Sequence, residues 1–192
     1  TNVFPHLQNL SEFAKSVRKL LKIDGVLLIE AHYFGNLIKD TAFDTIYHEH
    51  CSYWTASSVK KFCDLNGLEL FKIDQLPIHH GQIRCWISFK GSFKVDKSVN
   101  RLIKIEKNIK LHSNETLLKF KKKIFDLQKK VNQLFLNIKS KQKVIAGYGA
   151  PAKATTFTSF FNIDKKKLPY IFDKNPLKQN MYLPGANIPI IN

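Results

Sequence analysis

Apolar runs of strand length alternate with amphipathic helix patterns in the first half of this chain, and this alternation constrains the fold more than any other feature. Residues 9–22 repeat apolar side chains every three or four positions behind Asn9, which suits a helix cap. Residues 26–29 are uniformly apolar, as expected for a short strand buried on both faces. A long loop is expected from 32 to 53, followed by a helix and two strands near 55–66, 68–73 and 83–89. This order, a strand followed by a crossover helix and then two strands, predicts the second half of an α/β sheet.

The second half of the chain has a different character. Residues 97–141 lack glycine and proline and repeat apolar side chains at helical spacing, which predicts a helical connector. A strand is then expected to run into the glycine turn at 147–149, with a helix opening at Pro151. Residues 170–173 have the pattern of a further strand, and Asp173 at its end stands roughly 20 residues past the glycines, a spacing at which dinucleotide-binding folds place a ribose contact. We therefore expect half of an α/β domain, a helical connector and a partial second α/β lobe, at 1–95, 96–141 and 142–192.

Four ionisable side chains stand together at the end of the segment 43–50, namely Tyr47, His48, Glu49 and His50. Histidine has an unperturbed pKa of about 6.5, so it can take or give a proton near neutral pH. A solvent-facing loop has little use for such a cluster, and an apolar core would exclude most of it. On the residues alone, a catalytic site, a metal site and a buried polar network all remain open.

The composition narrows the classes of partner. The formal net charge is +16, but nearly all of the positive charge is lysine, with arginine at positions 18, 84 and 101 alone. Because arginine supplies the planar fork suited to phosphate or guanine, the composition argues against a dedicated nucleic-acid role. Three cysteines without a CxxC pair predict reduced thiols in the cytoplasm, with neither a disulfide framework nor a cysteine zinc site. No apolar run approaches the roughly 18–20 residues needed to span a bilayer.

Several irregular loop motifs agree with one family in both order and spacing, at 2–6, 43–53, 76–84, 147–153, 173–176 and 183–190. Together they closely resemble the S-adenosylmethionine-dependent C-methyltransferases that act on nucleotide-linked deoxysugars. The resemblance covers nearly the whole chain. It implies the second half of a Rossmann-like methyltransferase sheet, a long helical connector, and a partial Rossmann-like lobe that binds the nucleotide-linked sugar.

The resemblance also implies parts that these 192 residues do not contain. Family members begin with a small zinc-binding module, followed by the first half of the cofactor domain with its glycine-rich loop. We therefore expect an internal piece of a longer enzyme, with zinc in the N-terminal module and no metal site in this chain. The second motif departs from the family, because His80 and Gln82 stand where relatives have smaller residues, and this bears on the shape of the sugar pocket.

The reaction implied by the resemblance is methyl transfer from S-adenosylmethionine to the carbon next to the keto group of a nucleotide-linked deoxysugar. His50 would be the general base that removes the proton from that carbon. Tyr47 would contact the sugar or donate to the developing enolate, and Glu49 would orient the imidazole or hold a sugar hydroxyl. His48 would be a structural neighbour.

Binding residues follow from the same resemblance. Contacts to the nucleotide-linked sugar are expected at Gly81, Arg84, Tyr148 and Lys153. Contacts to S-adenosylmethionine are expected at Asn2 and His6. No role is expected for His32, His79 or His112, and the oligomeric state is not indicated.

Two other readings belong to different classes. The chain could be a non-catalytic module that binds the nucleotide-linked sugar but lacks the half that holds S-adenosylmethionine. A lysine-rich RNA-binding module is the third reading, and a steep salt dependence of affinity for single strands would favour it.

Overall fold

The computed structural model describes residues 2–78 and 81–192, which form two compact α/β units. Unit 1 takes in the described part of 1–42 and 48–120, and unit 2 comprises 43–47 and 121–192. The chain therefore leaves unit 1 after Ala42, returns to it at His48 and leaves again after Phe120. Helices and sheets in both units confirm the expected α/β class. The division into parts at 1–95, 96–141 and 142–192 stays a prediction.

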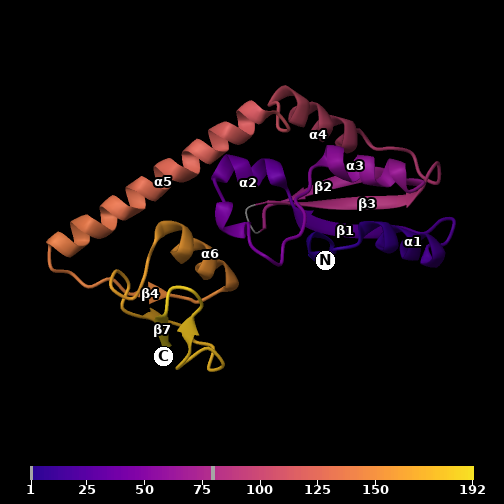
Figure 1. Ribbon diagram of the computed structural model, residues 1–192. Coiled ribbons are helices and arrows are strands. Elements are labelled where there is room, and N and C mark those ends of the chain that lie inside the picture. The colour runs from indigo at the N-terminus through magenta and orange to yellow at the C-terminus, as the bar shows by residue number, and fades with distance from the viewer. Residues whose placement is uncertain (1, 79–80) are drawn as a thin grey trace. The chain divides into compact units, whose positions relative to one another are not determined.

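The sheet of unit 1 has the strand order β1-β3-β2, where β1, β2 and β3 span Leu27–His32, Leu68–Leu76 and Gln82–Phe89. β3 is antiparallel to both neighbours, so β1 and β2 run in the same direction. Helix α3, Ala56–Leu65, joins these two strands and packs on β2 and β3 (Figure 1). This arrangement confirms the predicted strand, crossover helix and strand pair.

The core of unit 1 lies on one face of this sheet. Alternate strand residues point into it and are buried, namely Ile29, Ala31, Ile83, Cys85 and Ile87. Helix α1, Leu10–Leu20, and the 3-10 turn η1, Phe4–His6, also pack against this core. Helix α4, Lys97–Asn108, packs on β2 and α3. Burial raises the pKa of the Cys63 thiol to about 12 and also raises that of Cys85, which makes both thiols unreactive near neutral pH.

Local capping explains why two helices begin where the sequence predicts. The Asn9 side-chain oxygen accepts a hydrogen bond from the Glu12 N–H at 3.1 Å, at the start of α1. Thr55 and Ser58 form a reciprocal capping box at the start of α3. The start of α3 is also capped by a residue from far along the chain. The Glu106 carboxylate of α4 accepts hydrogen bonds from the N–H groups of Ala56 and Ser57, at 2.7 and 3.0 Å.

Three expectations need correction. β1 is not buried on both faces along its whole length, since Leu28 is 48% exposed, although Glu30 on the same face is buried. The stretch from 32 to 53 is not one loop, because it contains helix α2, Phe34–Asp40, and the 3-10 turn η2, Phe43–Thr45. The helical segment expected at 97–141 is two helices, α4 and α5 (Asn114–Ser140), separated where Lys110 adopts a positive φ of 49°.

The sheet of unit 2 has the order β4-β5-β7-β6, built from Gly147–Tyr148, Ile171–Phe172, Ile188–Ile191 and Tyr182–Leu183. β4, β5 and β7 are parallel, and β6 is antiparallel to β7. Helix α6, Ala152–Phe161, follows β4 after a three-residue turn, and Pro151 is its N-cap, so the helix begins one residue later than predicted. The ring of Phe43 packs on the rings of Phe160 and Phe161, at centroid distances of 5.0 and 5.6 Å, which attaches η2 to this unit.

Within the residues that the structure describes, no helix combines the length and the apolar character needed to cross a bilayer. The expected cytoplasmic location stays a prediction.

Candidate active site

His50 lies among three other rings of unit 1. Its ring centroid is 5.0 Å from that of His6, 5.2 Å from that of His32 and 6.3 Å from that of Tyr53. His6 ends η1, His32 ends β1, and Tyr53 belongs to the segment before α3, so distant parts of the sequence converge on this imidazole. His6 is exposed and the other three are half-buried, so the group sits at the surface, where a ligand can reach it.

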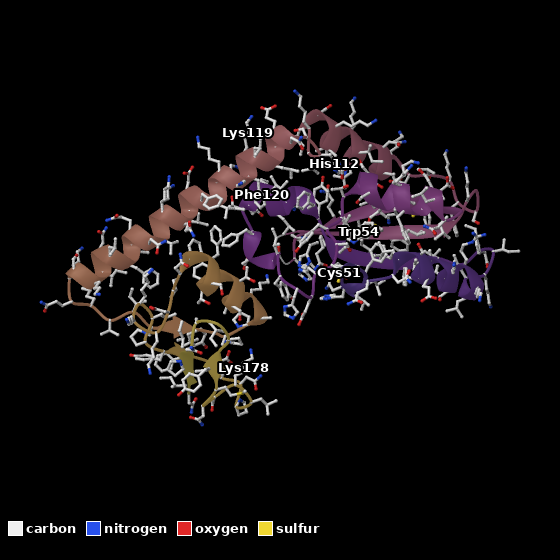
Figure 2. The ribbon with its side chains drawn as sticks, in the orientation of Figure 1. Cys51, Trp54, His112, Lys119, Phe120 and Lys178 are labelled. Carbon is white, nitrogen blue, oxygen red and sulfur yellow. The ribbon has the colours of Figure 1, made fainter. Side chains whose placement is uncertain are left out.

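A set of backbone contacts fixes the segment after His50. The Ser52 N–H donates to the Pro5 carbonyl at 3.2 Å, and the Phe34 N–H donates to the Trp54 carbonyl at 2.9 Å. The indole N–H of Trp54, a residue labelled in Figure 2, donates to the Ser52 hydroxyl at 2.9 Å, and its ring stacks on that of Phe4 at a centroid distance of 4.3 Å. These contacts hold the segment against η1, and they explain why His6 and His50 meet.

Gly81 shapes the edge of the sheet beside this group. Its φ of +93° lies in the region that favours glycine, and a Cβ there would lie 1.9 Å from Nδ2 of Asn36. The Tyr33 N–H donates to the Gly81 carbonyl at 3.2 Å, which links this turn to the end of β1. His79 and His80, which precede the turn, lie outside the described residues. The close approach to Asn36 is reason enough for a glycine here, and a substrate contact by Gly81 stays a prediction.

Two buried polar groups at this edge lack partners in the described part of the chain. Gln82 is 1% exposed, it pairs with His32 in the strand register, and neither Oε1 nor Nε2 of its amide has a hydrogen-bond partner there. The side-chain oxygen of Asn2 is also buried without a partner, while its backbone N–H donates to the Glu30 carbonyl at 3.2 Å. An unsatisfied buried polar atom is costly, so such atoms mark positions suited to a polar ligand.

Arg84 is held by a carboxylate on the neighbouring strand. Its Nε and Nη2 atoms lie 2.6 and 2.5 Å from Oε1 of Glu30, whose side chain is 7% exposed. Arg84 and Glu30 are partners in the strand register, so the sheet fixes this geometry. The guanidinium is 39% exposed and keeps further N–H donors, so the predicted contact to a substrate diphosphate is compatible with this ion pair and remains a prediction.

The cluster from Tyr47 to His50 is divided between the two units. His48, Glu49 and His50 belong to unit 1, whereas Tyr47 belongs to unit 2 together with η2. His48 and Glu49 are exposed in a turn, and Tyr47 and His50 are half-buried. The structure therefore groups His50 with His6, His32 and Tyr53, and the expected roles of Tyr47 and Glu49 stay predictions.

No role was expected for His32, and Gln82 was noted only as a departure from the family pattern. One signal was available for His32, since it ends a strand, where functional side chains of an α/β sheet gather. For Gln82 no such signal exists, because its burial depends on strand pairing, and the lack of an amide partner among the described residues is seen only in the structure.

Metal binding receives no geometric support. Across 2–78 and 81–192, no three or more His, Cys, Asp or Glu side chains are arranged to hold a metal ion.

The glycine turn of unit 2 leads from β4 into α6, as predicted. A Cβ on Gly147 would lie 2.8 Å from Ile171, so glycine lets β4 and β5 approach closely, and Gly149 has a φ of +85°. Tyr148 is 78% exposed, and Lys153 stands half-buried in the first turn of α6. Both lie at the carboxyl end of β4, where open α/β sheets bind ligands, so their predicted contacts to the substrate remain open to test.

Asp173 holds this turn in place. Its carboxylate accepts hydrogen bonds from the N–H groups of Ala150 and Asn175 at 2.7 and 2.8 Å, and Nζ of Lys178 lies 3.7 Å away. The Lys178 ammonium also donates to the Ala150 carbonyl at 2.8 Å (Figure 2). The spacing of Asp173 from the glycines suggested a ribose contact; these bonds give the carboxylate a structural function, and the ribose contact stays a prediction.

The N–H groups of Ala150 and Asn175, with the Lys178 ammonium, hold the pKa of Asp173 below its ordinary value. A lowered pKa in the folded state stabilises the turn at pH values above the unfolded pKa of about 3.9, and this contribution is lost as the pH falls further. We expect hydrogen exchange at the Ala150 amide to be slow at pH 7 and to lose protection below about pH 4. Asp173→Asn should lose part of that protection already at pH 7. Equal protection in the variant and the wild type at pH 7 would refute this role.

Comparison with known proteins adds two findings. Residues 77–192 match the family described as the C-methyltransferase C-terminal domain. Over 188 residues, the chain is 27% identical to the C-methyltransferase NovU of Streptomyces niveus, an alignment that covers 97% of this chain and 45% of that protein. The chain thus spans less than half the length of the curated relative that it matches.

Proposed function

Because this chain belongs to the family of C-methyltransferase C-terminal domains, we propose that it forms part of an enzyme that methylates a carbon of a nucleotide-linked keto sugar. The relative NovU is named a C-methyltransferase, which supports the reaction class. The sugar and its nucleotide are our own inference from the motifs and from the chemistry of the residues around His50.

The observation that carries the proposal is the position of His50, between His6 and His32 at the edge where β1 ends. Methylation at carbon requires removal of a proton from that carbon, and a keto group next to it makes the proton removable. A positioned imidazole can take that proton and typically contributes about 10²–10⁴-fold in rate. We assign this task to His50.

The negative charge that develops on the keto oxygen must be met by donors that are already in place. Tyr47 is our candidate donor, and Glu49 is our candidate for orienting the base or holding a sugar hydroxyl. The amide of Gln82, which has no hydrogen-bond partner among the described residues, offers a donor and an acceptor at the same edge as His32, so it is a further candidate contact for the sugar.

The family implies S-adenosylmethionine, which would supply an electrophilic methyl group. The residues present fit a polar part of this cofactor, since the buried side-chain oxygen of Asn2 lacks a hydrogen-bond partner within the described residues. His6 adds an exposed imidazole a few residues further on. Asn2 and His6 would therefore hold one edge of the cofactor. A zinc module elsewhere in the protein stays a prediction.

The nucleotide part of the substrate needs cationic and backbone partners. Arg84 in unit 1 and Lys153 with Tyr148 in unit 2 are the side chains that we propose for it, and the turn at Gly81 would lie against the sugar.

Methyl transfer by the complete gene product tests the proposal. The protein is incubated with S-adenosylmethionine labelled with ¹³C in the methyl group and with a nucleotide-linked keto sugar, and NMR locates the label. We expect the label on the carbon next to the ketone, and no transfer to a control sugar in which the ketone is reduced to an alcohol. Label on a sugar oxygen would contradict the proposal, and binding of the keto sugar without any transfer would favour the non-catalytic reading.

A further inference from the structure

Unit 2 contains a cavity of about 360 Å³ that takes no part in the proposed reaction. It is lined by one end of α5, the segment that leads into β4 and the segment that leads into β5. Both strands are parallel and begin here, so the cavity lies at their amino ends. Tyr148 and Lys153 follow the carboxyl end of β4, and neither lines the cavity. This site is therefore distinct from the candidate substrate contacts of the same unit.

The lining combines an apolar floor with a cationic rim. The apolar side chains are Phe135, Leu136, Val144, Ile145 and Pro169. The rim consists of Lys139, Lys143, Lys166 and Lys167, and no Asp or Glu lines the cavity. Although lysine is abundant throughout this chain, here four lysines surround one apolar cavity without an opposing carboxylate in its wall.

Hydrogen bonds hold one of these lysines in place, and none of the four forms an ion pair with a described carboxylate. The Lys167 ammonium donates to Oδ1 of Asn132 at 3.2 Å and to the Asn162 carbonyl at 2.7 Å, which sets its position at the rim. Within the described residues, Lys139, Lys143 and Lys166 form no ion pair with a carboxylate. The nearby Asp164 accepts hydrogen bonds from the backbone N–H groups of Lys166 and Lys167, so its carboxylate is already engaged.

The apolar floor is open to solvent. Leu136 is 60% exposed and Val144 is 72% exposed, beside the half-buried Phe135 and Ile145. Burial of such a surface under an apolar ring is favourable, while lysine rims attract phosphate as point charges. The volume lies at the small end of the range of about 300–1,000 Å³ that is usual for pockets that bind small molecules.

We propose that this cavity binds a small phosphate-bearing molecule with a flat apolar body, of the nucleoside diphosphate class. The base lies on the apolar floor, and the diphosphate meets Lys139, Lys143 and Lys166. This proposal concerns a second site, and it does not depend on methyl transfer at His50.

Calorimetry on the 192-residue chain tests the proposal, with ADP, pyrophosphate and adenosine as probes. ADP should bind more tightly than either of its parts. Lys143→Gln with Lys166→Gln should weaken ADP binding about tenfold or more, because two charge-assisted contacts are lost. The matched control is Lys122→Gln with Lys130→Gln, which makes the same change in net charge at exposed positions outside the cavity and should leave the affinity unchanged. Leu136→Ser should weaken ADP binding and leave pyrophosphate binding unaffected.

Three outcomes would overturn the proposal. Pyrophosphate or hexaglutamate that binds as tightly as ADP would show a general attraction to anions. A loss of ADP affinity in Lys122→Gln with Lys130→Gln as large as in Lys143→Gln with Lys166→Gln would also show a general attraction to anions. If Lys153→Gln lost ADP binding while the double variant Lys143→Gln with Lys166→Gln bound ADP as tightly as the wild type, the nucleotide would bind at the glycine turn instead.

Discussion

Glu106→Ala should unfold unit 1 at a clearly lower urea concentration than the wild-type chain, with a loss of about 3 kcal/mol or more in the free energy of unfolding. The Glu106 carboxylate is fully buried and accepts hydrogen bonds from the N–H groups of Ala56 and Ser57 and from the Ser57 hydroxyl. These donors form the first turn of α3, where the helix dipole also favours a negative charge. Alanine leaves them without an acceptor, at a cost of about 1–3 kcal/mol for each buried donor.

Tryptophan fluorescence reports this loss specifically, because both tryptophans of the chain, Trp54 and Trp86, belong to unit 1. Glu106→Gln should be less destabilising, since its amide keeps one acceptor oxygen for the helix N–H groups. Glu115→Ala is the matched control, because Glu115 forms an exposed ion pair with Lys119 on α5 and should have little effect. An unfolding midpoint for Glu106→Ala equal to that of the wild type would show that this carboxylate does not hold α3.

His50→Gln should lower the rate of methyl transfer by the complete gene product by about 10²–10⁴-fold, the usual contribution of a positioned general base. Glutamine retains much of the volume of the imidazole and can still form hydrogen bonds, but it cannot take up a proton near neutral pH. The rings of His6, His32 and Tyr53 should keep their places, because backbone contacts fix the segment around Ser52 and Trp54. The nucleotide-linked sugar should therefore still bind.

His48→Gln is the control for this variant. His48 is two residues away, is exposed, and has no place in the proposed chemistry. It should retain turnover within a few-fold of the wild type, as measured with labelled S-adenosylmethionine under saturating conditions. Equal losses in His48→Gln and His50→Gln would mean that the turn as a whole matters, and that His50 is not the base.

The parts of unit 1 that could be predicted are those that local sequence determines. Asn9 and Thr55 are side chains that cap their own helices, so α1 and α3 begin where they were expected. Apolar alternation likewise identified the strands at 68–73 and 83–89, which the structure extends by a few residues. Helix α2 was missed because it has no capping side chain and carries Gly35 near its start; it is anchored instead by the packing of Leu37, which is 2% exposed.

The parts that could not be predicted depend on contacts between distant segments. Glu106 caps a helix that begins about fifty residues earlier, and nothing near it in the sequence indicates this. His32 joins His50 only because β1 ends beside the segment that η1 holds in place. The same limit applies to Asp173. Its spacing from the glycines suggested a ligand contact, and only the structure shows that its carboxylate accepts a hydrogen bond from the Ala150 N–H.

Exchange of solvent deuterium into the substrate tests most directly whether His50 is the base that begins the reaction. The complete gene product is incubated in deuterium oxide with a nucleotide-linked keto sugar, and NMR follows the proton on the carbon next to the ketone. We predict that the wild type replaces this proton with deuterium, and that His50→Gln does not, although calorimetry shows that the variant binds the sugar. Exchange at the same rate in both proteins would contradict the account.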